Sequence, residues 1–192
     1  MFTLRAATPK DVDILASIEA QSFPEAEMAT RESFEKRLAV FPDCFLILFE
    51  DGEPVGLIDG MITNNRTISD DMFENANLHV PNGRWQSVFG LAVIPSKRHQ
   101  GCASTLMRAF IEKARQEGRD GLILTCKEKL IPFYEGFGYV NCGVSKSVHG
   151  GAVWYDMELD FREKPRDSCV SSAGREADSS FIRFAQAAVK HQ

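Results

Sequence analysis

The chain has 192 residues, of which 44% are hydrophobic and 26% charged, a length and composition typical of one ordinary globular core. They exclude a fibrous or largely disordered chain. The formal net charge of −5 disfavours a nucleic-acid partner, because no basic run is present to replace the counterions around phosphates.

No stretch approaches the roughly 20 apolar residues needed to cross a bilayer, and the N-terminus has no basic segment followed by a long apolar run. The five cysteines are widely spaced without a Cys-x-x-Cys pair, and the four histidines show no metal-ligand spacing. We therefore expect free thiols, no bound metal, no membrane partner and a cytoplasmic location.

The N-terminal segment predicts a strand over residues 2–6 followed by two helices. Thr8 offers an N-cap and Pro9 suits the first helical position, so a helix is expected to run to about Gln21. A second helix is predicted over 30–40 from its inward-facing apolar positions.

A hairpin and a long loop come next. Apolar runs at 44–50 and 55–62 flank the turn sequence Asp51-Gly52-Glu53-Pro54, which predicts antiparallel pairing. Residues 63–83 are polar and rich in turn residues. Loops of that length are usually functional or mobile, so we expect this one to lie over an active site.

The second half of the chain predicts a βαβ unit and further mixed elements. A strand at 85–94, an amphipathic helix ending at Gly118 and a buried strand at 121–126 form that unit. A helix at 131–137 and strands at 139–143 and 152–159 follow. We expect one domain over 1–161 and a flexible tail over 162–192, with a short helix near 181–189.

The turn before the amphipathic helix has the residues of an anion site. It reads Arg98-His99-Gln100-Gly101-Cys102-Ala103-Ser104. A helix start presents about four unpaired amides and roughly half a positive charge, which can bind a pyrophosphate without a metal. Lys97 and Arg98 would add charge. Taken alone, the turn is equally compatible with an ordinary connection between a strand and a helix.

The turn is followed by a buried strand and then by Ile131-Pro132-Phe133-Tyr134-Glu135-Gly136-Phe137-Gly138-Tyr139. This ordered set resembles the acetyl-CoA motif of the GNAT superfamily of N-acetyltransferases. Within that superfamily the chain is similar to the arylalkylamine (serotonin-type) enzymes, through Phe23-Pro24, the segments 78–83 and 126–134, and Leu91-Ala92-Val93. The expected fold class is α/β (α+β), with a mixed, mostly antiparallel central sheet flanked by helices.

The resemblance implies acetyl-CoA as cosubstrate. The backbone of Leu91, Ala92 and Val93 would pair with its pantetheine arm, residues 98–104 would hold its pyrophosphate, and Tyr134 would meet its sulfur. Tyr134, with a reference pKa near 10, is a reasonable acid for a departing thiolate, whose pKa is roughly 8.5 for a simple thiol. Without the motif, Tyr134 would read as a core aromatic residue.

The general base is where the chain departs from that family. Animal arylalkylamine enzymes have two histidines on the strand before the Leu-Ala-Val step, and the matching residues here are Ser87 and Phe89. The alternatives are Glu27, His79 or a water chain past Ser87. Glu27 is preferred, because the loop after the first helix lies over the acceptor site in this superfamily and a carboxylate would attract a cationic amine.

The resemblance implies that the acceptor is a small primary amine, in particular an arylalkylamine. Phe23, Pro24, Met28 and Phe89 would contact its apolar part, with Ser87 beside them. Direct attack on the thioester needs no nucleophilic Cys-His or Ser-His pair, and none is found. Cys102 and Cys126 are therefore read as structural. The alternatives are a polyamine or protein N-acetyltransferase and a non-catalytic acyl-CoA-binding module; the chain is expected to be a monomer or a dimer.

Overall fold

The computed structural model describes residues 1–162 as one mixed α/β unit. Nearly all of the predicted tail at 162–192, including the helix expected at 181–189, lies outside the described residues. The strands are β1 (Phe2–Ala6), β2 (Phe45–Glu50), β3 (Glu53–Asp59), β4 (Ile62–Thr63), β5 (Trp85–Val88), β6 (Gly90–Val93), β7 (Gly121–Cys126), β8 (Val140–Val144) and β9 (Tyr155–Asp160). The α-helices are α1 (Val12–Ser22), α2 (Arg31–Val40), α3 (Asp71–Glu74), α4 (Cys102–Gln116) and α5 (Ile131–Glu135).

The strands form two sheets, in the orders β1-β2-β3-β6 and β4-β5-β7-β9-β8. All neighbours pair antiparallel except β5 and β7, which are parallel and joined through α4. The predicted hairpin and βαβ unit are therefore confirmed. Asp51 (φ 51°) and Gly52 (φ 90°) both have positive φ, as the tight turn between β2 and β3 requires.

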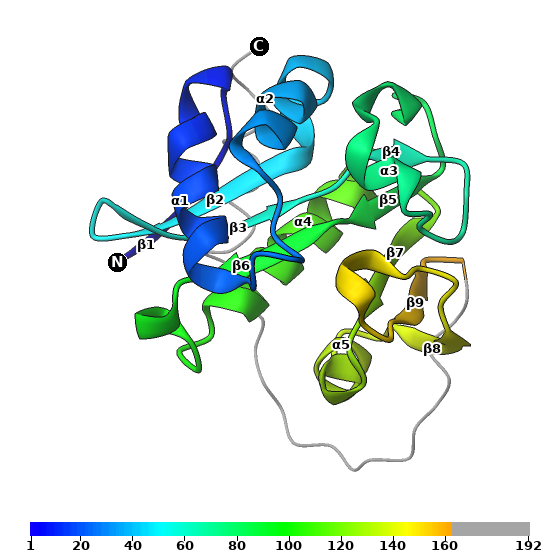
Figure 1. The fold of residues 1–192 in the computed structure, drawn as a ribbon. Coiled ribbons are helices and arrows are strands. Elements are labelled where there is room, and N and C mark those ends of the chain that lie inside the picture. Colours follow the sequence, from blue (N-terminus) through cyan, green and yellow to red (C-terminus); the bar gives the residue numbers. More distant parts are fainter. Residues whose placement is uncertain (163–192) are drawn as a thin grey trace.

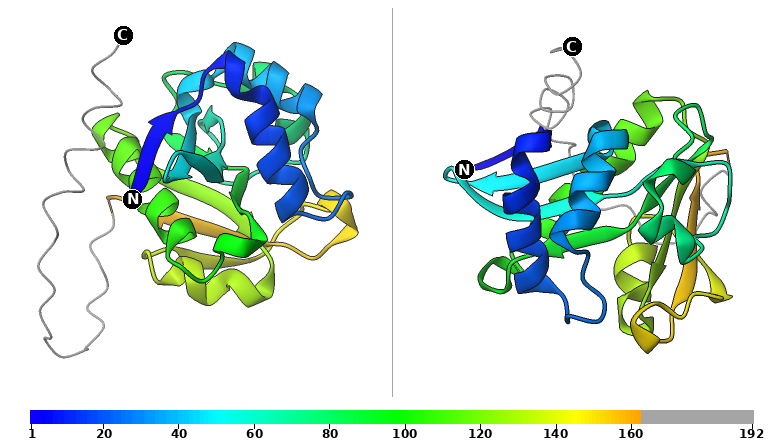
Figure 2. Two further views of the ribbon diagram at one scale, coloured as in Figure 1. Left: turned by 90° about the vertical axis from the view of Figure 1, so that its left-hand side faces the viewer. Right: turned by 45° about the horizontal axis from the view of Figure 1, so that its top comes forward.

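Helices cover both faces of the strands, with α1 and α2 on one side and α4 on the other (Figures 1 and 2). Alternate residues of β2 supply the two cores that result: Phe45 and Ile47 pack with the α1–α2 side, and Leu46 and Leu48 with the α4 side. A strand points successive side chains to opposite faces, so an apolar run such as β2 is buried on both. The predicted fold class is confirmed.

The strand predicted over 85–94 is divided into β5 and β6. Its first half pairs with β7 and its second half with β3, so the two halves belong to different sheets. Phe89 lies at the break, where its N–H donates to the carbonyl of Asp59 at 2.7 Å. The sequence pattern shows one apolar run because both halves are buried.

A second predicted strand, over 55–62, is also interrupted, at Gly60. A Cβ on Gly60 would lie 2.0 Å from the carbonyl oxygen of Ser87, which no side chain tolerates. The close passage of these two backbones fixes the place where the sheets separate.

The stretch at 63–83, predicted as a loop, contains α3 and a 3-10 turn at Ala76–Leu78. A guanidinium nitrogen of Arg37 donates to the carbonyl of Phe73 at 2.9 Å and ties this stretch to α2. The α-helix of the motif segment is shorter than predicted, ending at Glu135 rather than 137. In the described part of the chain, no helix has the length and apolar character of a membrane span.

Candidate active site

A cavity of about 250 Å³ opens where β6 separates from β7. Its walls come from the loop after α1, from α2 and α3, from the junction of β5 and β6, from the end of β7, from α5 and from the segment between β8 and β9. The side chains and backbone lining it belong to Glu19, Phe23, Glu27, Met28, Ala29, Thr30, Ser33, Arg37, Asp59, Phe73, Glu74, Val88, Phe89, Gly90, Leu91, Leu124, Thr125, Cys126, Leu130, Tyr134, His149 and Trp154.

The separation leaves one edge of β6 without a strand partner. The parallel pairing of β5 with β7 ends at Val88 and Leu124, and in residues 1–162 the only ladder of β6 is with β3. Backbone N–H and C=O groups seek partners, so this edge can accept an extended ligand by strand-like hydrogen bonds. Leu91 lies on that edge and lines the cavity.

The turn at 98–104 leads directly into α4. His99 (φ 59°) and Gly101 (φ 84°) have left-handed backbone conformations, and Gly101 is the N-cap of the helix. A Cβ added to Gly101 would meet no atom within 4 Å, so open space lies in front of the first amides of α4. An anion could approach there.

The charge that Lys97 and Arg98 were expected to add to this turn is used elsewhere. The Arg98 side chain donates to the carbonyls of Val93 at 3.2 Å and Ser22 at 3.1 Å. Lys97 forms an ion pair with Glu50. Arg98 therefore holds the backbone at Val93 and Ser22 through hydrogen bonds to neutral carbonyls and keeps its positive charge beside the turn, to which the helix N-terminus adds about half a charge.

Tyr134 of α5 lines the cavity from the side of the five-stranded sheet. It is buried in edge-to-face contacts with Phe133 and Tyr139, at centroid distances of 5.1 and 5.8 Å. Burial raises the pKa of the Tyr134 phenol well above its ordinary value, and Cys126 adds to the shift. Tyr134 therefore holds its proton at neutral pH and can act as a hydrogen-bond donor or weak acid.

Cys126, which also lines the cavity, is a poor nucleophile in this setting. Burial raises the pKa of its thiol to about 11. The thiolate is the reactive form of cysteine, so Cys126 stays almost wholly protonated near neutral pH.

The loop after α1 brings Phe23, Glu27 and Met28 to the cavity. Pro24 does not line it; the Pro24 carbonyl instead accepts the N–H groups of Glu27 and Met28 and shapes the turn. The Glu27 carboxylate pairs with Lys127 at 2.6 Å.

Ser87 and His79 lie away from the cavity. Ser87 is fully buried, and its hydroxyl donates to the carbonyl of Met61 at 2.8 Å. His79 accepts the N–H of Ile62 through Nδ1 at 3.2 Å and stacks on Phe41, and burial lowers its pKa. We therefore leave both residues out of the amine pocket, while Phe89 remains in it.

A row of aromatic rings that the sequence did not reveal forms one wall. Phe89 contacts Phe73 at a centroid distance of 4.9 Å, Phe73 stacks on His149 at 4.9 Å, and His149 lies 6.3 Å from Trp154. These rings come from three separate segments, so no local motif announces them. The one prediction that pointed to Phe73 was that the loop at residues 63–83 would lie over the active site.

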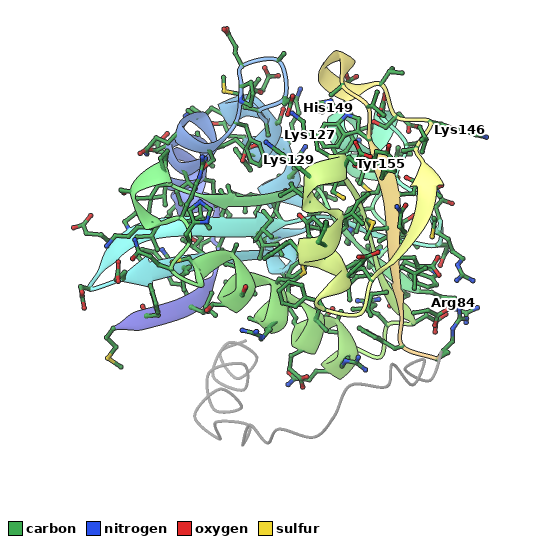
Figure 3. All side chains as sticks on the ribbon, turned by 90° about the horizontal axis from the view of Figure 1, so that it is seen from below. Arg84, Lys127, Lys129, Lys146, His149 and Tyr155 are labelled. Atoms are coloured by element: carbon green, nitrogen blue, oxygen red, sulfur yellow. The ribbon has the colours of Figure 1, made fainter. Side chains whose placement is uncertain are left out.

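The same aromatic segment meets the loop after α1 at the cavity. The His149 Nε2 atom lies 3.1 Å from the Glu27 carbonyl oxygen, and Lys127 lies 5.6 Å from the centre of the Trp154 ring. Figure 3 shows Lys127 and His149 together at this end of the molecule. Glu27 thus links the loop after α1 to Lys127, which follows β7, and to His149, which lies between β8 and β9.

A buried charge cluster at the cavity was also not predicted. Arg37 of α2 pairs with Asp59 of β3 at 3.0 Å, and Glu19 of α1 lies beside this pair. All three side chains are buried and line the cavity. The available signal was that Glu19 follows Leu15 by four residues and so shares the apolar face of α1.

Burial dominates the electrostatics of the cluster. It raises the pKa of Glu19 to about 7; the N–H of Ala29, bound at 3.0 Å, and the charge of Arg37 oppose the shift, while Asp59 reinforces it. Burial also raises the pKa of Asp59, against the opposing effect of Arg37. Because Arg37 is bonded directly to Asp59, Glu19 carries the less compensated charge.

Comparisons with known proteins agree with this geometry. The model of the acetyltransferase (GNAT) family matches residues 12–139. The serotonin N-acetyltransferase of Mesocricetus auratus is 26% identical over 162 residues, which cover 82% of this chain and 77% of that protein.

Solved structures show the same fold at lower identity. The loading GNATL domain of CurA from Lyngbya majuscula superposes with a TM-score of 0.72 at 15% identity, covering 83% of this chain and 98% of that one. The GphF GNAT-like decarboxylase, solved with isobutyryl-CoA, gives 0.71 at 19% identity, covering 83% and 99%.

The pKa of Glu19 leads to a stability prediction. A carboxyl whose pKa rises from 4.5 to about 7 on folding favours the fold when protonated, so this stabilisation is complete below about pH 4.5 and is lost as pH rises through 7. A shift of that size corresponds to about 3 kcal/mol. Relative to the wild type, Glu19→Gln should therefore gain about that much unfolding free energy between about pH 4.5 and about pH 8.

Urea unfolding of both proteins across this pH range measures the difference directly. Subtracting the unfolding free energy of the wild type from that of Glu19→Gln at each pH cancels the contributions of the titratable groups that the two proteins share. A difference that stays constant with pH would show that Glu19 titrates with an ordinary pKa.

Proposed function

Because the chain belongs to the GNAT family of acetyltransferases, we propose that it transfers the acetyl group of acetyl-CoA directly to a primary amine, with an arylalkylamine as acceptor. The observation that carries the proposal is the shared cavity. The open edge of β6, the Tyr134 phenol and the aromatic row all border it.

The proposed acetyl-CoA site runs along β6 and onto the start of α4. The pantetheine arm would pair with the backbone of Leu91, Ala92 and Val93 along the edge of β6 that has no strand partner in residues 1–162, at the point where Leu91 lines the cavity. The pyrophosphate would lie at residues 98–104, held by the amides of Cys102, Ala103 and Ser104 in front of Gly101. This arrangement binds the phosphates through amides and the helix dipole.

Tyr134 is proposed to protonate the departing thiolate. Its raised pKa keeps the phenol protonated at neutral pH, so a hydrogen-bond donor is in place where the sulfur develops charge. The phenol is a weaker acid than a simple thiol, whose pKa is roughly 8.5, so the hydrogen bond to the sulfur supplies the stabilisation and the proton follows as the C–S bond breaks. With Cys126 protonated, direct attack by the amine is favoured over an acyl-cysteine intermediate.

The aromatic row supports an aryl group on the acceptor. Phe73, Phe89, His149 and Trp154 offer ring faces and edges, and aromatic pairs add about 0.5–1.5 kcal/mol beyond the area that they bury. Phe23 and Met28 add apolar surface. The 26% sequence identity with a serotonin N-acetyltransferase supports an arylalkylamine as the acceptor.

Acidic residues at the cavity also suit other cationic acceptors. Glu27 and Glu74 line it with Glu19, and a polyamine or the amino group of a protein would be attracted equally by their charge. A non-catalytic acyl-CoA-binding module would use the β6 edge alone. We further infer a cytoplasmic location, consistent with the free buried thiols of Cys44, Cys102 and Cys126.

The acceptor class is tested by initial rates. With acetyl-CoA held constant, tryptamine and phenethylamine should give kcat/KM values above those of spermidine and of a peptide panel, because only the aryl groups fill the aromatic wall. Release of the CoA thiol is the measurement. If neither arylalkylamine reacts but spermidine does, the acceptor is a polyamine. CoA binding without thiol release with any amine would identify a binding module.

The two ends of α4 provide a matched test of the phosphate site. Gly101 (φ 84°) and Gly118 (φ 71°) both have positive φ and open space around the Cβ position. Alanine at either position should cost about 1 kcal/mol of stability. Only Gly101→Ala should weaken CoA binding, by about tenfold or more, because its methyl group lies where the phosphates approach the backbone.

Isothermal titration with CoA and thermal unfolding of both variants make the comparison. Equal CoA affinity in the Gly101→Ala and Gly118→Ala proteins would show that the pyrophosphate does not bind at this turn.

The acid is tested with two tyrosines of one cluster. Tyr134→Phe should lower kcat by about 10- to 1000-fold with little change in CoA affinity, the usual scale for a lost acid. Tyr139→Phe is the control, since its buried hydroxyl contacts Met107 Sδ at 3.6 Å and does not line the cavity. If steady-state kinetics give the same kcat for both variants, Tyr134 is not the acid and only packs in the aromatic cluster.

A further inference from the structure

Glu19 lines the cavity and has a buried carboxylate oxygen without a hydrogen-bond partner in the described residues. Its Oε1 atom accepts the N–H of Ala29 at 3.0 Å, whereas Oε2 is buried and has no hydrogen-bond partner among residues 1–162. The residue as a whole is 5% exposed. A buried oxygen left unbonded carries a free-energy cost, which a ligand donor arriving in the cavity would remove.

The free oxygen lies over the start of β6. The ideal Cβ position of Gly90 is 3.8 Å from Glu19 Oε2 and 2.8 Å from Asp59 Oδ1. Gly90 immediately precedes Leu91, at the start of the strand proposed to bind pantetheine. Because Gly90 has no side chain, no atom of its own lies between Oε2 and the backbone of β6 at this point.

Glu27 is placed differently. Its Oε1 is already paired with Lys127 at 2.6 Å, and its backbone carbonyl is in contact with His149. Glu27 is therefore held by contacts from two other segments, and its place is suited to joining these segments at the cavity and to attracting a cation.

We propose that Glu19 is the general base of the reaction, with Oε2 receiving the proton of the acceptor ammonium group. This inference rests on the proposed function. It identifies a replacement for the two histidines that the related enzymes have at the positions of Ser87 and Phe89.

The proton and electron balance is complete with the groups at hand. R-NH3⁺ gives one proton to Glu19, and the lone pair of the resulting amine forms the C–N bond to the thioester carbon. Collapse of the adduct breaks the C–S bond, and Tyr134 protonates the sulfur. The second proton lost by nitrogen restores Tyr134, and Glu19 releases its proton to solvent.

The electrostatic surroundings agree with this role. A pKa of about 7 leaves Glu19 able both to accept a proton near neutral pH and to release it afterwards. Asp59 and Arg37 face Glu19 from β3 and α2. Because Arg37 forms its ion pair with Asp59, the carboxylate of Glu19 is free to interact with a cationic ligand. The other titratable side chains at the cavity are Glu27, Glu74, Cys126, Tyr134 and His149.

The test is the pH dependence of kcat/KM for tryptamine in the wild type, Glu19→Gln and Glu74→Gln. The wild type should show an acidic limb near pH 7 and a plateau up to about pH 10, where the amine itself loses its proton. Glu19→Gln should be about 10²- to 10⁴-fold slower at neutral pH and rise tenfold per pH unit, because it depends on free amine. Glu74→Gln removes an equal charge from an exposed position on the same cavity and should keep the acidic limb.

A weakly basic acceptor gives a second readout. β,β-Difluorophenethylamine has a much larger neutral fraction at pH 7 than phenethylamine, because its fluorines withdraw electrons from the amine, and the neutral form needs no base to free its lone pair. The ratio of wild-type to Glu19→Gln rates should therefore fall by about tenfold or more for this amine relative to phenethylamine. A purely structural defect would lower both rates equally.

The outcomes separate the two proposals. A wild-type protein that acetylates no amine overturns the proposed function itself. An active wild type together with a Glu19→Gln protein that keeps the acidic limb overturns only the role of Glu19. Binding of CoA by Glu19→Gln, measured by titration, verifies that the variant is folded.

Discussion

The structure depends on one constraint of backbone hydrogen bonding, which is that residues 85–93 must serve two sheets. β5 pairs with β7, β6 pairs with β3, and Phe89 lies between them with its N–H on the carbonyl of Asp59. A strand cannot follow two diverging partners, so the chain leaves β7 and exposes an unpaired edge. The cavity, the free edge of β6 and the approach to α4 all result from that separation.

The buried charges occur at the same place. Asp59 ends β3, where the two sheets part, and needs Arg37 to compensate its charge; Arg37 in turn binds the carbonyl of Phe73 and lies 5.0 Å from the ring of Phe89. One ion pair thereby fixes α2, α3 and the β5–β6 junction relative to one another. Breaking such a pair leaves an uncompensated buried charge, which is strongly destabilising.

Local sequence patterns predicted the parts of the protein that are continuous in sequence. The hairpin at Asp51-Gly52, the βαβ unit and the helix starting at Gly101 follow from turn residues and apolar periodicity. Parts assembled from distant segments escaped prediction. His149 and Phe73 stack although they are 76 positions apart in the sequence, and the break at Gly60 reflects contact with the backbone of Ser87. Glu19 was visible as an acid on an apolar helix face, but its unbonded oxygen depends on the tertiary fold.

Burial acts in the same direction on the two groups proposed to move protons, yet it gives them opposite roles. It disfavours the charged form of each and raises both pKa values. For Glu19, the rise from 4.5 brings the carboxyl to about 7, where it exchanges a proton readily near neutral pH. For Tyr134, the same effect moves the phenol further from neutrality and secures its proton. Glu19 belongs to α1, which packs on the four-stranded sheet, and Tyr134 to α5, which contacts β8 and β9. The separation of the sheets thus brings the proposed proton acceptor and the proposed proton donor to one cavity from different sheets, which is the arrangement that the proposed acetyl transfer to an ammonium group would use.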